Sequence, residues 1–306
     1  MNATEDNVND VDELLNISQI IYITFGLTIL VLGTIGNLLD IVSFVRLECL
    51  KTLASSQFLL ASFFGSEIML ITGILLPIIQ GFITLNTFIG ATIICKIRWY
   101  FRTVSGTFSL ACVCFAAIDR YLVSCIDIRR HRLITLTRAR WIIFCIASFW
   151  LLVLSPYALY YTASNQKDCA IINPVFAYFA PYFNLFHYSI LPLSILSILC
   201  VLTWENLGKQ QAIYLRGTRL YDQITRMIIG QILVIFFTSI PNMIWQIYIV
   251  STNSTSKSTL RQAQEDLIGN VCILIGYLTH AMPFYVYWMA SVTFRQNIKA
   301  LLLHVH

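Results

Sequence analysis

Long apolar stretches separated by short polar segments dominate the chain. A helix rises about 1.5 Å per residue, so about 20 apolar residues cross a hydrocarbon core of roughly 30 Å. Seven stretches reach this length, near Ile20–Phe44, Leu53–Gln80, Thr92–Val123, Trp141–Tyr161, Val175–Trp204, Ile224–Val250 and Leu267–Ser291. Because a backbone in lipid must satisfy its own hydrogen bonds, the pattern predicts membrane-spanning helices rather than open strands.

A shorter amphipathic pattern follows the seventh stretch. In Thr293–Leu303 apolar residues recur at helical spacing, and Arg295 and Lys299 fall on the opposite side. Such a segment predicts a short helix in the membrane surface. The expected fold is therefore an all-α membrane protein, a seven-transmembrane helix bundle with a short C-terminal amphipathic helix.

The composition excludes a water-soluble domain. Of 306 residues, 58% are hydrophobic and only 11% are charged, whereas soluble domains average about 25% charged residues. The net charge of +5 comes from basic residues in short clusters between apolar runs. Membrane lipid headgroups and a cytoplasmic partner explain such clusters better than nucleic acid does.

Two patterns predict that the N-terminus is outside the cell. With that orientation, 14 Lys and Arg residues fall on the inner side and 6 on the outer side, as the positive-inside rule requires. The N-glycosylation acceptors at Asn2, Asn16 and Asn253 all fall outside. We expect a multi-pass plasma-membrane protein with an extracellular tail over residues 1–19, a seven-span domain over 20–291 and a cytoplasmic helix and C-terminus over 292–306.

The third span carries the sharpest motif. Cys95 begins it and Asp119-Arg120-Tyr121 ends it, so that Arg120 follows Cys95 by 25 residues. At about 1.5 Å per residue, this separation corresponds to roughly 37 Å, the thickness of a hydrocarbon core with part of its headgroup layers. Cys169 is the other cysteine in an outer loop, so the pattern predicts a Cys95–Cys169 disulfide that holds this loop over the bundle, with two free thiols as the alternative.

With these residues in place, the chain resembles the rhodopsin-like (class A) G-protein-coupled receptors over nearly its full length. The matching residues are Gly36-Asn37, Asp119-Arg120-Tyr121, Trp150, Pro192, Pro241, Pro283, Tyr287 and Phe294-Arg295. In its general character the chain is most similar to invertebrate neuropeptide receptors of the FMRFamide-like kind or to orphan receptors.

The resemblance implies a receptor that passes an extracellular signal to a heterotrimeric G protein. Asp119 would hold Arg120 at rest, with Asp222 as a second partner, and activation would release Arg120 toward the G protein's α subunit. Pro241 breaks the hydrogen-bond ladder of the sixth span and permits the kink about which that helix swings outward. Tyr287 would be the tyrosine of the seventh-span motif.

Several positions depart from the family pattern. Ser239 stands where the family has a tryptophan, and Cys200 stands where it has a tyrosine in the fifth span. Met282-Pro283 replaces Asn-Pro, and the usual sodium-binding aspartate of the second span falls on Ser66 or nearby, which makes a sodium site doubtful. A receptor-like chain with impaired coupling is therefore an alternative.

Buried polar residues predict a cluster within the bundle. Asp40 lies one turn after Asn37, and both could meet Ser66 and Glu67 of the second span. Ionisable groups at membrane depth normally face the bundle interior. The cluster could be a structural hydrogen-bonded group or an ion or proton sensor.

Basic and aromatic residues near the outer ends predict the ligand site. We expect a cavity formed by Arg98, Trp99, Arg102, Trp245, Gln246 and His280, although interfacial aromatic residues would give a similar pattern. The seventh span has no lysine for a retinal Schiff base, and Arg102 stands where amine receptors carry an acid. A peptide or an anionic small molecule is the expected ligand, with a peptide favoured.

Other functional classes fit less well. A transporter would show inverted repeats and interrupted helices, and a channel would show repeated rings of charge. The sequence has no metal-ligand spacing, nucleophile elbow or phosphate loop. We expect no catalytic residues, no metal and no cofactor.

Overall fold

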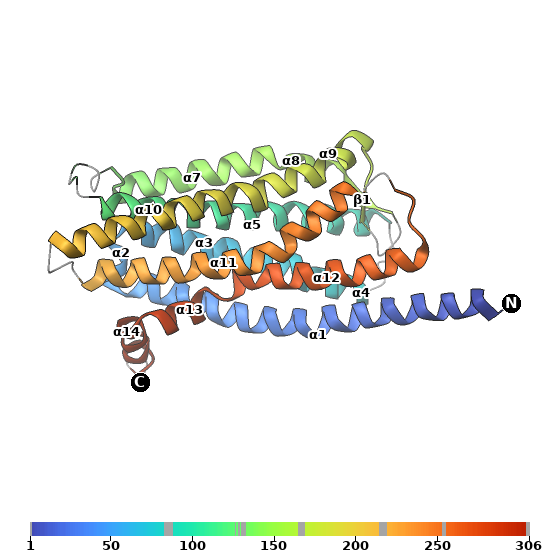
Figure 1. The fold of residues 1–306 in the computed structure, drawn as a ribbon, viewed down its shortest axis with the longest axis horizontal. Coiled ribbons are helices and arrows are strands. Elements are labelled where there is room, and N and C mark those ends of the chain that lie inside the picture. The colour runs from blue at the N-terminus through green and yellow to red at the C-terminus, as the bar shows by residue number, and fades with distance from the viewer. Residues whose placement is uncertain are drawn as a thin grey trace.

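Helices run alongside one another over nearly the whole length of the molecule (Figure 1). The computed structural model describes residues 2–82, 88–125, 127, 129, 133–164, 169–213, 219–252 and 255–303, without the side chains of 2–8, 48–49, 89, 207–213, 219–222 and 300–303. The elements are α1 (Asn2–Arg46), α2 (Glu48–Lys51), α3 (Ala54–Leu70), the π-helix η1 (Ile71–Leu75), α4 (Leu76–Phe82), α5 (Phe88–Ser124), α7 (Leu136–Val153), α8 (Ser155–Tyr160), β1 (Tyr161–Ala163), β2 (Cys169–Ile171), α9 (Pro174–Asn184), the π-helix η2 (Leu185–Ile190), α10 (Leu191–Ile213), α11 (Arg219–Ser251), α12 (Thr259–Ala281), α13 (Pro283–Ala290) and α14 (Val292–Leu303).

The predicted seven-span bundle is confirmed. Six continuous helical segments are long and apolar enough to cross a membrane, and α12 with α13 forms a seventh span that bends by 53°. The bend falls at Met282, directly before Pro283. Proline lacks an amide hydrogen and clashes with the preceding turn, so α12 ends there and α13 starts in a new direction.

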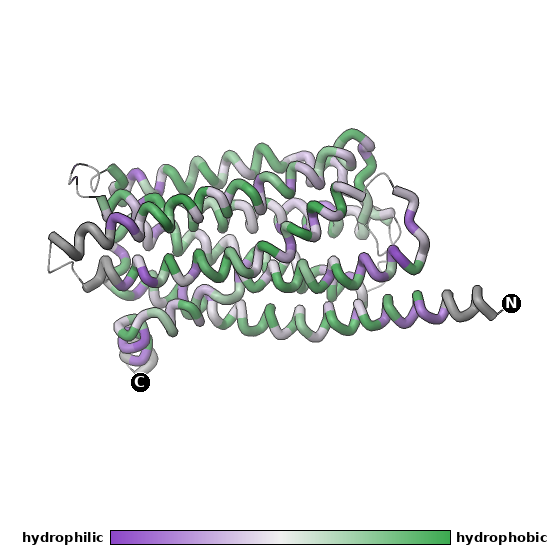
Figure 2. Tube along the Cα trace, viewed as in Figure 1, coloured by the Kyte–Doolittle hydropathy of each residue, from purple (hydrophilic) through white to green (hydrophobic). Residues whose placement is uncertain are grey.

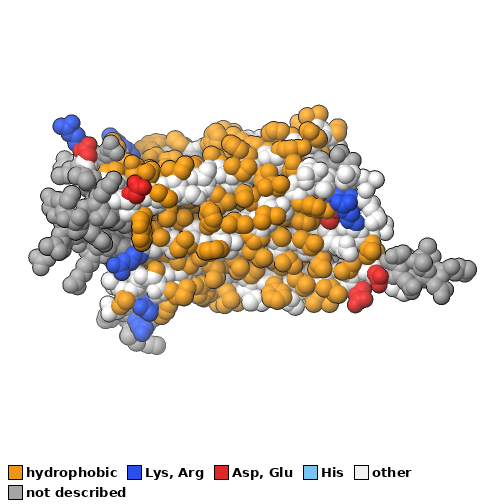
Figure 3. Space-filling model, viewed as in Figure 1, with side chains coloured by type: hydrophobic (Ala, Val, Ile, Leu, Met, Phe, Trp, Pro, Cys, Tyr) orange, Lys and Arg blue, Asp and Glu red, His pale blue; other side chains and the backbone are white. Residues whose placement is uncertain are grey.

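The surface of the bundle is apolar along its middle. Figure 2 shows hydrophilic residues gathered toward the two ends, and Figure 3 shows charged side chains at both ends of an apolar band. Large side chains such as Leu152, Val175 and Phe237 are more than 70% exposed. Hydrocarbon chains of a bilayer cover such a surface without the free-energy cost that water would impose.

Two features of the helices differ from the sequence expectation. Residues 2–19, expected as an extracellular tail, are helical and continuous with the first span in α1. The second and fifth spans each contain a π-helical turn, η1 and η2. A π-helical turn adds one residue to a turn and rotates the side chains that follow, and such turns are frequent at functional sites.

The inner half of the bundle has an aromatic core that includes the terminal helix. Tyr287 is fully buried and its ring contacts those of Phe44, Phe63 and Phe294 at centroid distances of 6.0–6.3 Å. Phe294 and Ile298 of α14 are buried while Lys299 is exposed. The apolar face of α14 therefore packs on the bundle, as its amphipathic pattern predicts.

Three spans meet at Gly73 in η1. The hydroxyls of Tyr22 in α1 and Tyr277 in α12 both donate to the Gly73 carbonyl, at 2.7 and 2.9 Å. A Cβ at Gly73 would lie 2.4 Å from the Tyr277 hydroxyl oxygen. Only glycine therefore permits this approach.

Candidate functional site

A disulfide and a short hairpin cover one end of the bundle. Cys95 near the start of α5 is bonded to Cys169 in β2, as predicted. β2 pairs with β1 in antiparallel register, Tyr161 opposite Ile171 and Ala163 opposite Cys169. The disulfide holds the hairpin against α5 beside a cavity.

Removing the disulfide should destabilise the protein. Cys95 and Cys169 are 74 residues apart, and cross-links over loops of this order typically contribute about 2–4 kcal/mol. We expect Cys169→Ala to lower both the thermal unfolding temperature in detergent and the amount of folded protein recovered from membranes. Cys272→Ala, which removes a free thiol, is the matched control, and equal stability of the two variants would contradict the expectation.

The cavity lies between the outer halves of α5, α9, α11 and α12. It has a volume of about 270 Å³ and is lined by residues that include Trp99, Arg102, Trp245 and Gln246. These are four of the six residues predicted to bind a ligand. The indole Nε1 of Trp99 and the Oε1 of Gln246 are buried without a hydrogen-bond partner among the described residues. A ligand could supply both partners.

Arg102 is the main charge of this cavity. Its guanidinium lies over the rings of Trp99 and Tyr277, at 5.1 and 5.5 Å from their centroids. No carboxylate of the described residues forms an ion pair with it. Tyr161, also in the lining, cannot act as the anion because burial raises its pKa to about 12. Arg102 therefore presents a positive charge held only by aromatic faces.

Arg98 and His280 do not line the cavity. Arg98 donates a hydrogen bond to Gln80 at 3.4 Å and lies over the Trp99 ring. His280 lies deeper, fully buried, where its Nε2 bonds the Tyr188 hydroxyl at 2.8 Å. Tyr188 itself is part of the lining. The Tyr188 side chain therefore lies between His280 and the cavity.

Several lining residues were not predicted. They are Tyr161, Asn184, Tyr188, Asn242 and Tyr277. Each is a polar or aromatic residue in or beside an apolar span, and the sequence contains no signal that shows which face of a helix it occupies. The π-helical turn η2 places Tyr188, and this turn has no sequence signature of its own.

The predicted polar core is divided into separate groups. Glu67 accepts hydrogen bonds from Thr34 at 2.9 Å and from Asn37 at 3.2 Å. Ser66 faces another direction and bonds Ser109 at 2.9 Å and Nδ1 of His280 at 3.1 Å.

Asp40 belongs to neither group. It is fully buried, and its carboxyl oxygens have no hydrogen-bond partner among the described residues. Within the described part of the chain, no three His, Cys, Asp or Glu residues are placed to hold a metal ion. A chain of hydrogen bonds does run from Tyr188 in the cavity through His280 and Ser66 to Ser109.

The inner end of α5 holds the Asp-Arg-Tyr motif. Arg120 donates to Asp119 at 2.5 Å, and both side chains are buried. Tyr121, half-buried, uses its carbonyl to accept the hydroxyl of Ser124. Asp222 lies in the first turn of α11, and its side chain is outside the described residues, so its pairing with Arg120 stays a prediction.

Two features of α11, a proline and a hydrogen bond, bear on the outward swing predicted for this helix. Pro241 lies inside the helix, as the kink hypothesis requires. Ten residues before Pro241 in the same helix, Gln231 is buried and its Oε1 accepts a hydrogen bond from the Tyr287 hydroxyl of α13. The sequence did not single out Gln231. Its bond joins the sixth span to the seventh near the inner end.

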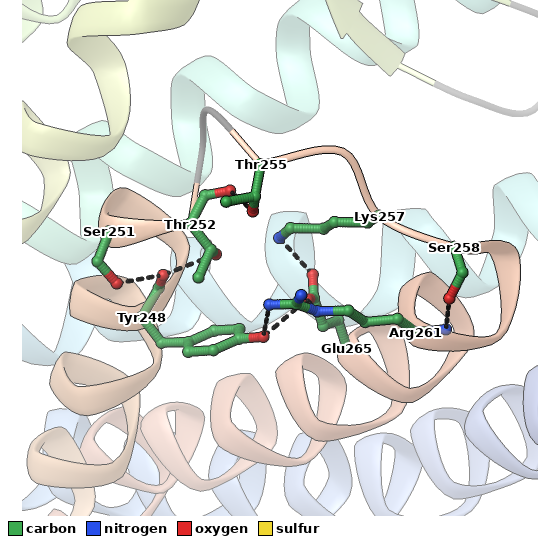
Figure 4. A network of polar contacts seen from close by, with 8 residues as sticks. All are labelled: Tyr248, Ser251, Thr252, Thr255, Lys257, Ser258, Arg261 and Glu265. Carbon is green, nitrogen blue, oxygen red and sulfur yellow. Dashed lines mark hydrogen bonds and ion pairs between the residues drawn. The ribbon is translucent and has the colours of Figure 1, made fainter.

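A charged network joins the outer ends of α11 and α12 (Figure 4). Glu265 binds Lys257 at 2.5 Å and Arg261 at 3.0 Å, and it also accepts the Tyr248 hydroxyl at 2.8 Å. Arg261 in turn donates to that hydroxyl at 2.9 Å. Asp266, the exposed residue next to Glu265, adds a second carboxylate, so the two cations and two acids of this rim balance in formal charge.

Of the three predicted glycosylation acceptors, the structure describes the side chain of one. Asn16 is exposed on α1. The side chain of Asn2 and the whole of Asn253 lie outside the described residues. Modification at these three positions stays a prediction.

The comparison with known families agrees with this geometry. The family model of the 7 transmembrane receptor (rhodopsin family) matches residues 36–283. No curated protein matches the chain. The matched range contains the disulfide, the cavity, the Asp119–Arg120 pair and Pro283 at the bend. The chain therefore belongs to the rhodopsin family of G-protein-coupled receptors, which carry extracellular signals to G proteins and are not enzymes.

Proposed function

We propose that this receptor responds to an extracellular peptide that carries an acidic group into the cavity beside Arg102. The signal would pass to a heterotrimeric G protein at the Arg120 end of the bundle. The proposed orientation places the N-terminus outside and the receptor in the plasma membrane. The end of the chain marked N lies at the same end of the bundle as β1 (Figure 1), which supports this orientation.

The observation that carries the proposal is the uncompensated guanidinium of Arg102. Its contacts are two aromatic faces, Trp99 and Tyr277, and no acid among the described residues. Arg102 is half-buried, and a cation that is partly removed from water is costly unless an anion pairs with it. A carboxylate matches the planar donor fork of arginine in a bidentate pair, whereas an amine would be repelled.

The shape and charge of the outer end favour a peptide over a small anion. The cavity of about 270 Å³ would admit only the tip of a peptide. The remainder would lie over β1 and β2 and along the rim formed by Lys257, Arg261 and Glu265, which offers charged groups of both signs. An amidated peptide, as expected for the neuropeptide class, would have to supply the acid from an Asp or Glu side chain.

The proposal is tested with acidic peptides and their neutral partners. Cells that express the receptor with chimeric G proteins are screened against a peptide library for calcium responses. Each active peptide is then compared with versions in which a carboxylate is replaced by an amide. We expect one such replacement to weaken potency at least about thirtyfold in the wild type, since the loss of a buried charged partner costs about 2 kcal/mol or more.

Arg102→Gln should remove this difference between acid and amide. Arg98→Gln is the matched control, because Arg98 is bound to Gln80 and does not line the cavity, and it should keep most of the preference. Equal potency of acid and amide peptides on the wild type would contradict the proposal. So would a screen in which only biogenic amines respond.

A further inference from the structure

A second cavity opens to the lipid between α5, α7 and the segment η2–α10. It has a volume of about 570 Å³, and nearly all of its lining is apolar, including Phe115, Ile146 and Phe149. Phe149 and Trp141, at the wall, are 55% and 64% exposed. We refer to this cavity as the lipid-facing groove. No charged side chain lines it.

His187 of η2 is the exception in this lining. It is 2% exposed, and its ring lies 5.7 Å from that of Trp150, which also lines the groove. Nδ1 lies 2.5 Å from the Phe183 carbonyl oxygen, which can only accept, so Nδ1 carries the proton. Nε2 is then an acceptor, and it has no hydrogen-bond partner among the described residues.

The depth of His187 limits what could supply the missing donor. The residue lies near the middle of its span, Pro174–Asn206, and Trp150 lies near the middle of Leu136–Tyr160. Neither bulk water nor a headgroup reaches that depth of a bilayer. Thr107, the nearby hydroxyl of the lining, already donates to the Thr103 carbonyl at 2.8 Å. The described lining thus offers no free hydroxyl donor for Nε2, and a molecule that occupies the groove would supply one.

The other end of the groove lies at the membrane surface. Trp141 lines it near the start of α7, and Arg140, the preceding residue, is exposed. The nine residues from Trp141 to Trp150 correspond to about 13 Å along the helix. Arg140 does not line the groove but is the exposed cation next to its surface end, so a ligand with an anion there, an apolar chain along the walls and one hydroxyl at the depth of His187 would match these residues.

We propose that the lipid-facing groove binds a free long-chain fatty acid with a hydroxyl near the middle of its chain. The carboxylate lies at the headgroup level beside Arg140, and the hydroxyl donates to Nε2 of His187. A sterol fits less well, because its single polar group lies at one end of the molecule and cannot satisfy both ends of the groove. The site is separate from the cavity at Arg102 and does not depend on the peptide proposal.

The test uses the full-length receptor in phosphatidylcholine nanodiscs. A diazirine analogue of 12-hydroxyoctadecanoic acid is photoactivated, and labelled peptides are mapped by mass spectrometry. We expect labels on α5 and α7 at the groove. Unlabelled 12-hydroxyoctadecanoic acid should compete about threefold to tenfold better than octadecanoic acid or 2-hydroxyoctadecanoic acid, the range expected for one hydrogen bond.

Two variants and one control separate this site from general lipid contact. His187→Phe should remove the preference for the 12-hydroxy acid while octadecanoic acid still competes, and Ala111→Phe, which fills the groove, should abolish specific labelling. Leu152→Phe changes an exposed residue of α7 outside the groove and should behave as wild type. Equal competition by all three acids, stronger competition by cholesterol, or full labelling of Ala111→Phe would overturn the proposal.

Discussion

An Arg120→Ala receptor is expected to bind its ligand and to lose at least about nine-tenths of its G-protein activation. In the structure Arg120 is buried and bound to Asp119, and the family resemblance assigns it to the G protein's α subunit after release. Loss of the side chain removes a contact made only in the active state, and a loss of about 1.4 kcal/mol or more corresponds to tenfold. Ligand binding and nucleotide exchange on purified G protein measure the two effects separately.

Asp119→Asn is the complementary variant and should act in the opposite direction. Breaking a buried ion pair by removing one partner costs about 3–5 kcal/mol, here mainly in the resting state. If about 1% of receptors are active at rest, a shift of this size would make the active form the majority. An undiminished ligand response of Arg120→Ala would show that the arginine lacks this role. A wild type that binds ligand but activates no G protein would instead favour the receptor-like chain with impaired coupling.

The second large effect is expected at Gln231. Gln231→Leu keeps the size of the side chain but leaves the Tyr287 hydroxyl buried without its acceptor. An unsatisfied buried hydroxyl costs about 1–3 kcal/mol. Since this bond joins α11 to α13 while Arg120 is still bound to Asp119, the resting state should lose stability. We expect a lower unfolding temperature and several-fold higher basal signalling.

Tyr287→Phe provides the control for this bond. It removes the hydroxyl and the need for an acceptor, so adding Gln231→Leu should then have little further effect. A double-mutant cycle on the unfolding temperature of the ligand-free receptor measures this coupling. Fully additive changes would mean that the two side chains act independently.

The sequence was sufficient for the fold because apolar length and charge asymmetry act over whole helices. Cys95, Asp119 and Arg120 could be placed because their separation matches the thickness of a membrane. Gln231 could not be predicted, because one polar residue in a long apolar span reveals neither its depth nor its partner. Pro283 marks a position in the seventh span at which a helix can break, but the size of the bend there depends on packing.

The candidate cavity was predicted only in part for a related reason. Trp99, Arg102 and Trp245 were correctly grouped because they share the outer level of their spans. The direction of Tyr188, and with it the hydrogen bond to His280, depends on the π-helical turn η2, which shifts the helical phase without any change in composition. Ser66 and Glu67 are sequence neighbours, so they necessarily face different helices.

The shared carbonyl of Gly73 also limits which parts of the receptor can move. Tyr22 and Tyr277 bind the same oxygen from two sides, so the first, second and seventh spans are fastened together at the ligand level. These three helices would then stay fixed relative to one another, as the stationary part of the receptor, and the sixth span would be the part that moves against them. Because Tyr277 of the seventh span and Trp245 of the sixth line the same cavity, a ligand seated there would contact the stationary part and the moving part at once.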